Sequence, residues 1–360
     1  MVSGWLAARA LADDAKPKGQ AFESEAQVYA DGATEFPVYR LTDASYTSTL
    51  PAAQNRIVSR NSGSLLYGCD RDGSPQAFRM NLKSGDTEQL TDRPALDPRS
   101  LTFLPDNRSF CYLAERTLYQ VMLANLRERP VYTVPDGWEP SRGICVAADG
   151  AHVGLIERRS ETSRLRLAPL PAGPARTVVE VPFGIADPME RPQRAQWLYR
   201  KESGGLGLVD AAGRQNRNCK LAAGGAGSVW WSADGKSLLY LNFPEDRTQL
   251  NAIREYLPDD ETDKLVAKTS QYASFGVNRD ASVFVGASQN KASPVILLML
   301  RVTHRELTLC EHRASQPQMV TPIFSPDAQR IYFQSDLHGK PALYSVHVER
   351  LVEKIENDVP

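Results

Sequence analysis

The chain has 360 residues, a formal net charge of −1 and 42% hydrophobic residues. It can therefore bury a large core, and it has no charge bias toward nucleic acid or an anionic membrane surface. Because it lacks an apolar run of about 18 residues, we expect no membrane-spanning helix. The five cysteines are scattered without a CxxC pair, and no zinc-finger spacing occurs, so we interpret them as small buried apolar residues.

The first 12 residues have the pattern of the back half of a secretory signal. Residues 4–8 (GWLAA) are apolar, and residues 10–12 (ALA) fit a small-x-small cleavage site. We therefore predict export to the periplasm or the exterior, with a signal of the twin-arginine type truncated here. A disordered alanine-rich tail is the alternative. Residues 13–30 would then be a polar leader, and residues 31–356 a single domain.

A strand–turn–strand pattern repeats along the rest of the chain. Near the C-terminus, residues 321–324, 330–335 and 342–346 have the apolar content of strands and are separated by Pro, Asp and Gly. Similar turns recur about every 44 residues, as expected of a repeat architecture. They are centred on Ser62, Asp106, Asp149, Asp234, Asp280 and Asp327. The double gap between Asp149 and Asp234 predicts a degenerate unit near residues 185–225.

The repeats predict an all-β fold, a seven-bladed β-propeller. A small antiparallel sheet cannot bury both of its faces alone, and radial packing in a closed ring solves this while protecting the edges. The last unit ends soon after its third strand, at residues 343–348, whereas residues 36–42 resemble an outer strand. We therefore predict that the N-terminal strand joins the last blade and closes the ring. A stack of open β-hairpins is the alternative.

The repeats resemble TolB-type and WD40-like propellers, and they are more closely similar to the oligogalacturonate lyases, a family of polysaccharide lyases. The similar segments include residues 31–34 (DGAT), 64–73 (SLLYGCDRDG), 309–312 (LCEH) and 323–348. The likeness covers most of the chain from residue 31, and it is faint between residues 120 and 225. It implies a β-elimination beside a galacturonate, in which Mn²⁺ binds the sugar carboxylate and an arginine removes the neighbouring proton.

The metal site that the resemblance implies, three histidines and one glutamine, does not carry over. Gln316 matches the family's glutamine, but the three histidine ligands fall on Ser274, Met319 and Thr321. A further active-site histidine falls on Ser228, and no arginine aligns with the base. Such a set is a poor site for Mn²⁺, and none of the five histidines replaces the missing ligands. We therefore predict no bound cofactor. His312, the histidine nearest to Gln316 in sequence, is expected to be a surface or structural residue.

The residues that precede each turn by six or seven positions should lie near one mouth of the central channel. They are Arg56, Arg99, Arg142, Arg191 or Arg194, Ser228, Ser274 and Thr321. A semicircle of arginines would bind carboxylates in a bidentate manner, and Trp197 and Trp230 would stack on sugar rings. The alternative is that these arginines are ordinary loop residues and both tryptophans belong to the core between blades.

Two functions remain open on the sequence alone. The first is a lyase-like protein that acts on acidic, pectin-derived oligosaccharides, although its catalytic residues are unknown. The second is a non-catalytic, TolB-like propeller that binds a saccharide or a protein partner at its central face. The missing histidines favour the second function on chemical grounds, and the family resemblance favours the first.

Overall fold

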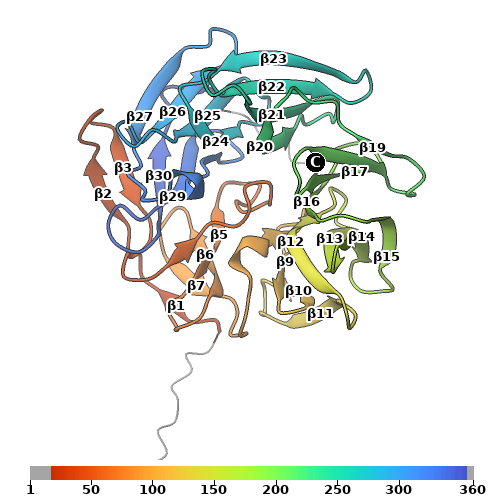
Figure 1. Ribbon diagram of the computed structural model, residues 1–360. Helices are drawn as coiled ribbons and strands as arrows, with labels where there is room; N and C mark the ends of the chain where they lie inside the picture. The colour runs from red at the N-terminus through yellow and green to blue at the C-terminus, as the bar shows by residue number, and fades with distance from the viewer. Residues whose placement is uncertain (1–17, 355–360) are drawn as a thin grey trace, which may run out of the picture.

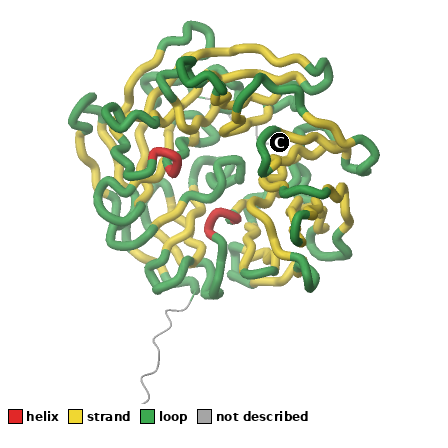
Figure 2. The backbone as a smooth tube through the Cα atoms, viewed as in Figure 1, coloured by secondary structure: helices red, strands yellow, loops and turns green. Residues whose placement is uncertain are grey.

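The computed structural model describes residues 18–354 and forms a ring of seven antiparallel sheets (Figure 1). Within this part of the chain, helix is limited to two short 3₁₀ turns, η1 (Pro98–Ser100) and η2 (Pro317–Met319) (Figure 2). The prediction of an all-β, seven-bladed propeller is confirmed. No helix within residues 18–354 has the length and apolarity to cross a membrane. The predicted signal remnant lies outside the described residues.

The strands of each blade follow one another along the chain, from the centre of the ring outward. Blade 1 contains β4 (Ser48–Thr49), β5 (Ser64–Cys69), β6 (Gln76–Asn81) and β7 (Thr87–Gln89). Blade 2 contains β8 (Thr102–Phe103), β9 (Ser109–Ala114), β10 (Thr117–Met122) and β11 (Glu128–Thr133). Blade 3 contains β12 (Glu139–Val146), β13 (His152–Arg159), β14 (Thr162–Pro169) and β15 (Arg176–Val181).

The second half of the ring follows the same order. Blade 4 contains β16 (Ile185–Glu190), β17 (Gln196–Lys201), β18 (Leu206–Asp210) and β19 (Asn216–Asn218). Blade 5 contains β20 (Gly225–Trp231), β21 (Leu238–Phe243), β22 (Ala252–Leu257) and β23 (Thr262–Lys268). Blade 6 contains β24 (Tyr272–Val277), β25 (Val283–Ser288), β26 (Val295–Leu300) and β27 (Glu306–Glu311). Blade 7 contains β28 (Ile323–Phe324), β29 (Arg330–Ser335) and β30 (Ala342–His347).

The N-terminal strands complete blade 7, as predicted. Strand β3 (Pro37–Arg40) pairs antiparallel with β30, with Val38 opposite Val346, and β2 (Gln27–Ala30) pairs with β3. Val38 and Val346 are both fully buried, in a cluster that also includes residues of blade 6. The two ends of the described chain are thus joined within one sheet, and β3 covers the outer edge that β30 would otherwise leave open.

The predicted polar leader is partly wrong. Strand β1 (Ala21–Phe22) pairs with β7 at the outer edge of blade 1, and β2 lies at the outer edge of blade 7. The sheets therefore begin at Ala21 and not at residue 31. Most residues of β1 and β2 are exposed because each strand is the outermost of its sheet, and this explains why their composition resembles that of a leader.

The degenerate blade predicted near residues 185–225 is blade 4. Its first turn, between β16 and β17, has Pro192 where five of the other six turns have Asp, and Gln193 follows at a φ of 55°. The blade packs on blade 3 through Trp197, which is 2% exposed. A Cβ atom added at Gly154 of β13 would lie 2.2 Å from the indole Cζ3 of Trp197. Glycine at this position therefore lets the indole lie against the β13 backbone.

Two irregular segments cross the centre of the ring. Between β4 and β5, residues 50–57 leave the sheet of blade 1 until Val58 pairs with Leu65. The loop preceding β5 accordingly lies near the middle of the ring in Figure 1. In blade 2, residues 97–101 leave the inner strand through η1. The two segments bind each other, because the amide of Ala52 and the side-chain amide of Asn55 both donate to the carbonyl of Arg99, at 3.0 and 3.2 Å.

Candidate functional site

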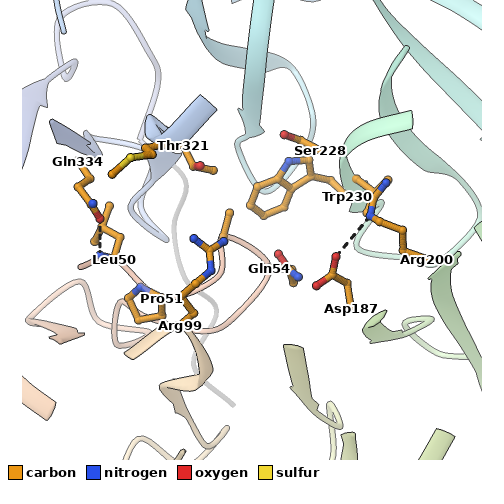
Figure 3. A pocket seen from close by; sticks show the side chains of 13 residues that line it. Leu50, Pro51, Gln54, Arg99, Asp187, Arg200, Ser228, Trp230, Thr321 and Gln334 are labelled. Atoms are coloured by element: carbon orange, nitrogen blue, oxygen red, sulfur yellow. Dashed lines mark hydrogen bonds and ion pairs between the residues drawn. The ribbon is translucent and has the colours of Figure 1, made fainter. Parts of the chain in front are cut away.

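A cavity of about 200 Å³ lies on one side of these crossing segments; we call it the Arg99 cavity (Figure 3). Residues from blades 1, 2, 4, 5 and 7 line it. The polar and aromatic members are Gln54, Arg99, Asp187, Arg200, Ser228, Trp230, Thr321 and Gln334. Cations, hydroxyls, amides and one indole around a small volume are typical of a site that binds a polar ligand in one orientation.

Arg99 extends from a rigid backbone into this cavity (Figure 3). Its peptide is fixed in η1, where the Asp97 carboxylate accepts from the Arg99 amide at 2.9 Å. The residue is exposed, and within residues 18–354 its guanidinium has neither a hydrogen-bond partner nor an ion-pair partner. An unpaired guanidinium can bind a carboxylate in a bidentate manner.

Asp187 and Arg200, which the sequence reasoning missed, form an ionic group on the opposite wall. Asp187 lies in a bulge of β16 and receives two hydrogen bonds from Arg142, at 2.9 and 2.7 Å. Nε of Arg200 lies 3.4 Å from the same carboxylate. The hydrogen bonds to Asp187 raise the pKa of Arg142, whereas burial lowers the pKa of Arg200. Arg142 is therefore neutralised by Asp187 and is not free to bind a ligand.

The close approach of Arg142 and Asp187 requires a glycine. Gly143 has a φ of +88°, and a Cβ atom there would lie 3.0 Å from the Cα atom of Asp187. A side chain at position 143 would thus be strained and would also press on the bulge that presents Asp187. Asp187 could not be found from the sequence, because the bulge turns this residue, two positions inside β16, toward the cavity.

Trp230 and Ser228 of blade 5 are anchored on the next blade. The Trp230 indole donates to the carbonyl of Phe275 at 2.9 Å, and the Ser228 hydroxyl accepts from the Phe275 amide at 3.2 Å. Trp230 is only partly buried, and Figure 3 shows its ring facing the cavity. Its hydrogen bond fixes the ring orientation and leaves a face available for stacking on a sugar.

The structure brings together four of the predicted binding residues, Arg99, Ser228, Trp230 and Thr321, in the Arg99 cavity. Their role in binding stays a prediction. The predicted semicircle of arginines is wrong, because Arg56 faces a different cavity beyond the crossing segments and Arg142 is paired with Asp187. Equal spacing from the turns would place these arginines on one side only if every inner strand were regular, whereas residues 50–57 leave their sheet.

The other predicted residues lie elsewhere. Arg191 is buried and bonds to Gly235 and Asp259, and Arg194 is exposed on the same turn. Trp197 belongs to the core between blades 3 and 4. Ser274 is buried, and its hydroxyl donates to the carbonyl of Val320. Gln316 is exposed beside η2, at a small hollow next to the Arg99 cavity that also contacts Met319.

The residues at the positions implied for Mn²⁺ do not fit this ion. Ser274 is committed to a backbone carbonyl, Met319 offers a thioether, and Thr321 and Gln316 offer only neutral oxygens. Mn²⁺ prefers carboxylate, imidazole and water ligands. Within residues 18–354, no group of three or more His, Cys, Asp or Glu side chains is placed to hold a metal.

His312 does not supply a substitute ligand. It is fully buried, its Nδ1 accepts from the Ala314 amide at 3.1 Å, and its Nε2 lies 3.0 Å from the carbonyl of Ser288. Since Nδ1 faces an N–H group, Nε2 carries the proton, and both nitrogens are used. Burial lowers the pKa of His312 and keeps the ring neutral. The residue is structural, as expected from the sequence.

Comparison with known proteins places the chain near one group of enzymes. The family model of oligogalacturonate lyases matches residues 16–166. The chain is 25% identical to an oligogalacturonide lyase of Pectobacterium atrosepticum and 24% identical to an oligogalacturonate lyase of Dickeya dadantii. Each alignment covers 92% of this chain and 98% of the relative.

Solved structures show the same fold. An oligogalacturonate lyase in complex with manganese superimposes with a TM-score of 0.86 at 22% identity, over 92% of this chain and 98% of the other. TolB from Acinetobacter baumannii superimposes with a TM-score of 0.50 at 12% identity, over 69% of this chain and 63% of the other. The chain is thus a seven-bladed β-propeller that is similar to the oligogalacturonate lyases over most of its length.

Proposed function

We propose that the Arg99 cavity binds the sugar at one end of an acidic, pectin-derived oligosaccharide through the carboxylate of that sugar. This binding does not need a metal ion. The unpaired guanidinium of Arg99, which faces the cavity from a fixed backbone, carries this proposal. The indole of Trp230 offers a surface for a sugar ring, and Ser228, Thr321 and Gln54 offer groups for its hydroxyls. A cavity of about 200 Å³ has room for one end of such a chain and not for its whole length.

A calorimetric titration with trigalacturonate tests the proposal. We expect binding to the wild-type protein that is unchanged by a chelator, since Arg99 and not a metal ion neutralises the carboxylate. The Arg99→Gln variant should bind about ten- to a hundredfold more weakly, because a hydrogen bond to a charged group contributes about 1.5–3 kcal/mol. The matched control is Arg194→Gln, which removes an exposed arginine outside the cavity. Equal binding by the Arg99→Gln variant and the wild type would refute the proposal.

A β-elimination is the second candidate function, and Arg200 is the observation that favours it. Its guanidinium lines the cavity, and burial lowers its pKa, which brings an arginine closer to acting as a base. It would take the proton from the carbon beside the sugar carboxylate; the electron pair would form the double bond, and the glycosidic oxygen would leave. Against this role, Arg200 also donates to the carbonyls of Ala226 and Gly227.

Ultraviolet absorbance separates the two functions, because elimination forms an unsaturated, conjugated uronate whereas binding does not. The assay uses trigalacturonate with the wild-type protein and with the Arg200→Lys variant. Product formation by the wild type that is lost in the variant would establish a lyase. We expect no product in either case, because the residues that would hold the activating ion are missing.

Export to the periplasm or the exterior stays a proposal and is consistent with a pectin-derived ligand. It rests on the pattern of residues 4–12 and on the resemblance to the oligogalacturonate lyases. Fractionation of the source cells, in which the protein is made with its native N-terminus, tests it. Recovery of the protein in the cytoplasmic fraction would contradict it.

A further inference from the structure

The Arg99 cavity has an unpaired donor group on one wall and an acceptor on the opposite wall. A guanidinium carries only N–H donors, whereas an ionised carboxylate only accepts. Arg99 of blade 2 and Asp187 of blade 4 both line the cavity. Figure 3 shows Gln54, from the crossing segment between β4 and β5, lying between them. The cavity therefore suits a ligand that has a carboxylate on one side and a hydroxyl on the other.

The Asp187 carboxylate keeps acceptor capacity although it is paired. A carboxylate offers about four acceptor positions. Arg142 occupies two of them, and Nε of Arg200 lies at a longer distance of 3.4 Å. The Asp187 side chain is 16% exposed and lines the cavity, so a ligand hydroxyl can donate to a position that remains. Since the two guanidiniums compensate its charge, Asp187 repels an acidic sugar less than a lone carboxylate would.

The Gln54 side chain is free to bind a ligand. It is half-buried, and within residues 18–354 its amide has no hydrogen-bond partner. The next residue holds the segment in place, because the Asn55 side chain donates to the carbonyls of Arg99 and Leu101, at 3.2 and 3.1 Å. A primary amide both donates and accepts. A hydroxyl that donates to Asp187 can therefore accept from Gln54.

Gln54 lies at the inner end of the Arg99 cavity. Together with Ala53 and Trp230 it also lines a second cavity, of about 1100 Å³, beyond the crossing segments. Thr321, before β28, lines the Arg99 cavity, whereas Ser325, after β28, lines the second cavity, so the two open toward opposite mouths of the ring. The end of a ligand that enters the Arg99 cavity from its own mouth therefore meets Gln54.

We propose that Gln54 and Asp187 bind a free ring hydroxyl of the sugar whose carboxylate lies on Arg99, and that the cavity thereby selects uronates that are not O-acetylated. This inference rests on the function proposed above. The hydroxyl donates to Asp187 and accepts from the amide of Gln54. Acetylation removes the hydroxyl proton and adds bulk within a cavity of about 200 Å³. A site that binds a hydroxyl in this way rejects a ligand without it, because polar groups of the site are left unpaired.

Calorimetric titrations with trigalacturonate and with O-acetylated trigalacturonate test the inference. We expect the wild-type protein to bind the acetylated sugar at least tenfold more weakly. The Gln54→Met variant should bind trigalacturonate about three- to tenfold more weakly, because an uncharged hydrogen bond is lost. Its penalty for acetylation should fall by a similar factor, since both changes remove the same contact. The matched control Gln215→Met, at an exposed position outside the cavity, should keep both affinities.

The outcomes separate this inference from the function on which it rests. If trigalacturonate does not bind the wild type, the proposed function fails and this inference fails with it. If trigalacturonate binds and Arg99→Gln weakens it, but the acetylated sugar binds equally well, only this inference fails. It also fails if Gln54→Met weakens both sugars by the same factor, which is the effect of a residue with a purely structural role. The comparison of the two sugars on the wild type needs no variant, so it remains decisive if Gln54→Met does not fold.

Discussion

Arg191 is fully buried whereas Arg194, in the same turn of blade 4, is exposed. The sequence offered both as candidates for one binding position and could not separate them, because each follows β16 by a few residues. What separates them is a contact across blades. The Arg191 guanidinium donates to the carbonyl of Gly235 at 2.6 Å and forms two hydrogen bonds of 2.8 Å with Asp259. It thereby fixes a turn that lacks the aspartate present in five of the other six turns.

The Arg191→Met variant should lose about 2–3 kcal/mol of unfolding free energy. The substitution leaves a buried carbonyl without a donor and removes a buried guanidinium from its carboxylate partner. Urea unfolding followed by fluorescence measures the loss. The matched control Arg194→Met should stay within about 0.5 kcal/mol of the wild type, as is usual for an exposed site. Equal losses in the two variants would contradict the assigned contacts.

His312 makes the stability depend on pH. Its pKa is lowered in the folded state by burial, whereas in the unfolded chain it takes up a proton at about pH 6.5. Below that pH the unfolded state binds more protons, so the free energy of unfolding falls as the pH falls until the folded pKa is reached. Thermal melts between about pH 7 and pH 5 should show this fall in the wild type.

The His312→Gln variant should show a smaller fall over the same pH range, even though it starts from a lower stability. The control is His304→Asn, at an exposed position with a φ of 54° that asparagine tolerates. This control should keep the slope of the wild type. A His312→Gln variant with an unchanged slope would show that other groups cause the pH dependence.

At the scale of elements, the regular turns and apolar strands predicted the blades, and the short last unit predicted the closure by β3. The crossing segments were not predictable in the same way. Residues 50–57 contain Pro51 and Asn55 and have the composition of any loop. Their path depends on contacts with η1 of blade 2, about 44 residues further along the chain. Long-range hydrogen bonds of this kind leave no periodic signal in a sequence.

The N-terminal segment is also fixed by such contacts. The Asp31 carboxylate accepts from the amides of Ala33 and Thr34 and, across blades, from the amide of Glu311 at 2.9 Å. The Thr34 hydroxyl donates to the carbonyl of Leu309 at 2.7 Å. The loop between β2 and β3 thus ties the strands that close blade 7 to the outer strand of blade 6.

The free energy of unfolding of the Asp31→Ala variant should be about 2 kcal/mol lower than that of the wild type, because a buried carboxylate with several amide donors is lost. Chemical denaturation monitors the change, and Glu23→Ala, at an exposed position of the same segment, serves as control. If the two variants are equally stable, the contacts of Asp31 do not contribute to the closure of the ring.

At the scale of the molecule, the closed ring creates two unlike mouths from one channel. The Arg99 cavity is small and is lined by a guanidinium, hydroxyls and an indole, and a second cavity of about 1100 Å³, which includes Arg56, is lined by apolar side chains and arginines. The sequence indicated the residue types at the first mouth. It did not indicate the partition of the channel, because Arg56 and Arg99 occupy equivalent positions of successive repeats and only the crossing segments direct them to opposite sides.

A crystal structure of the protein grown with trigalacturonate and Mn²⁺ tests the central claim most directly. The account predicts a galacturonate carboxylate within hydrogen-bond distance of the Arg99 guanidinium, a sugar ring against Trp230, and no ion coordinated between Gln316 and Thr321. A manganese ion held at those residues, or a sugar bound away from the Arg99 cavity, would contradict it.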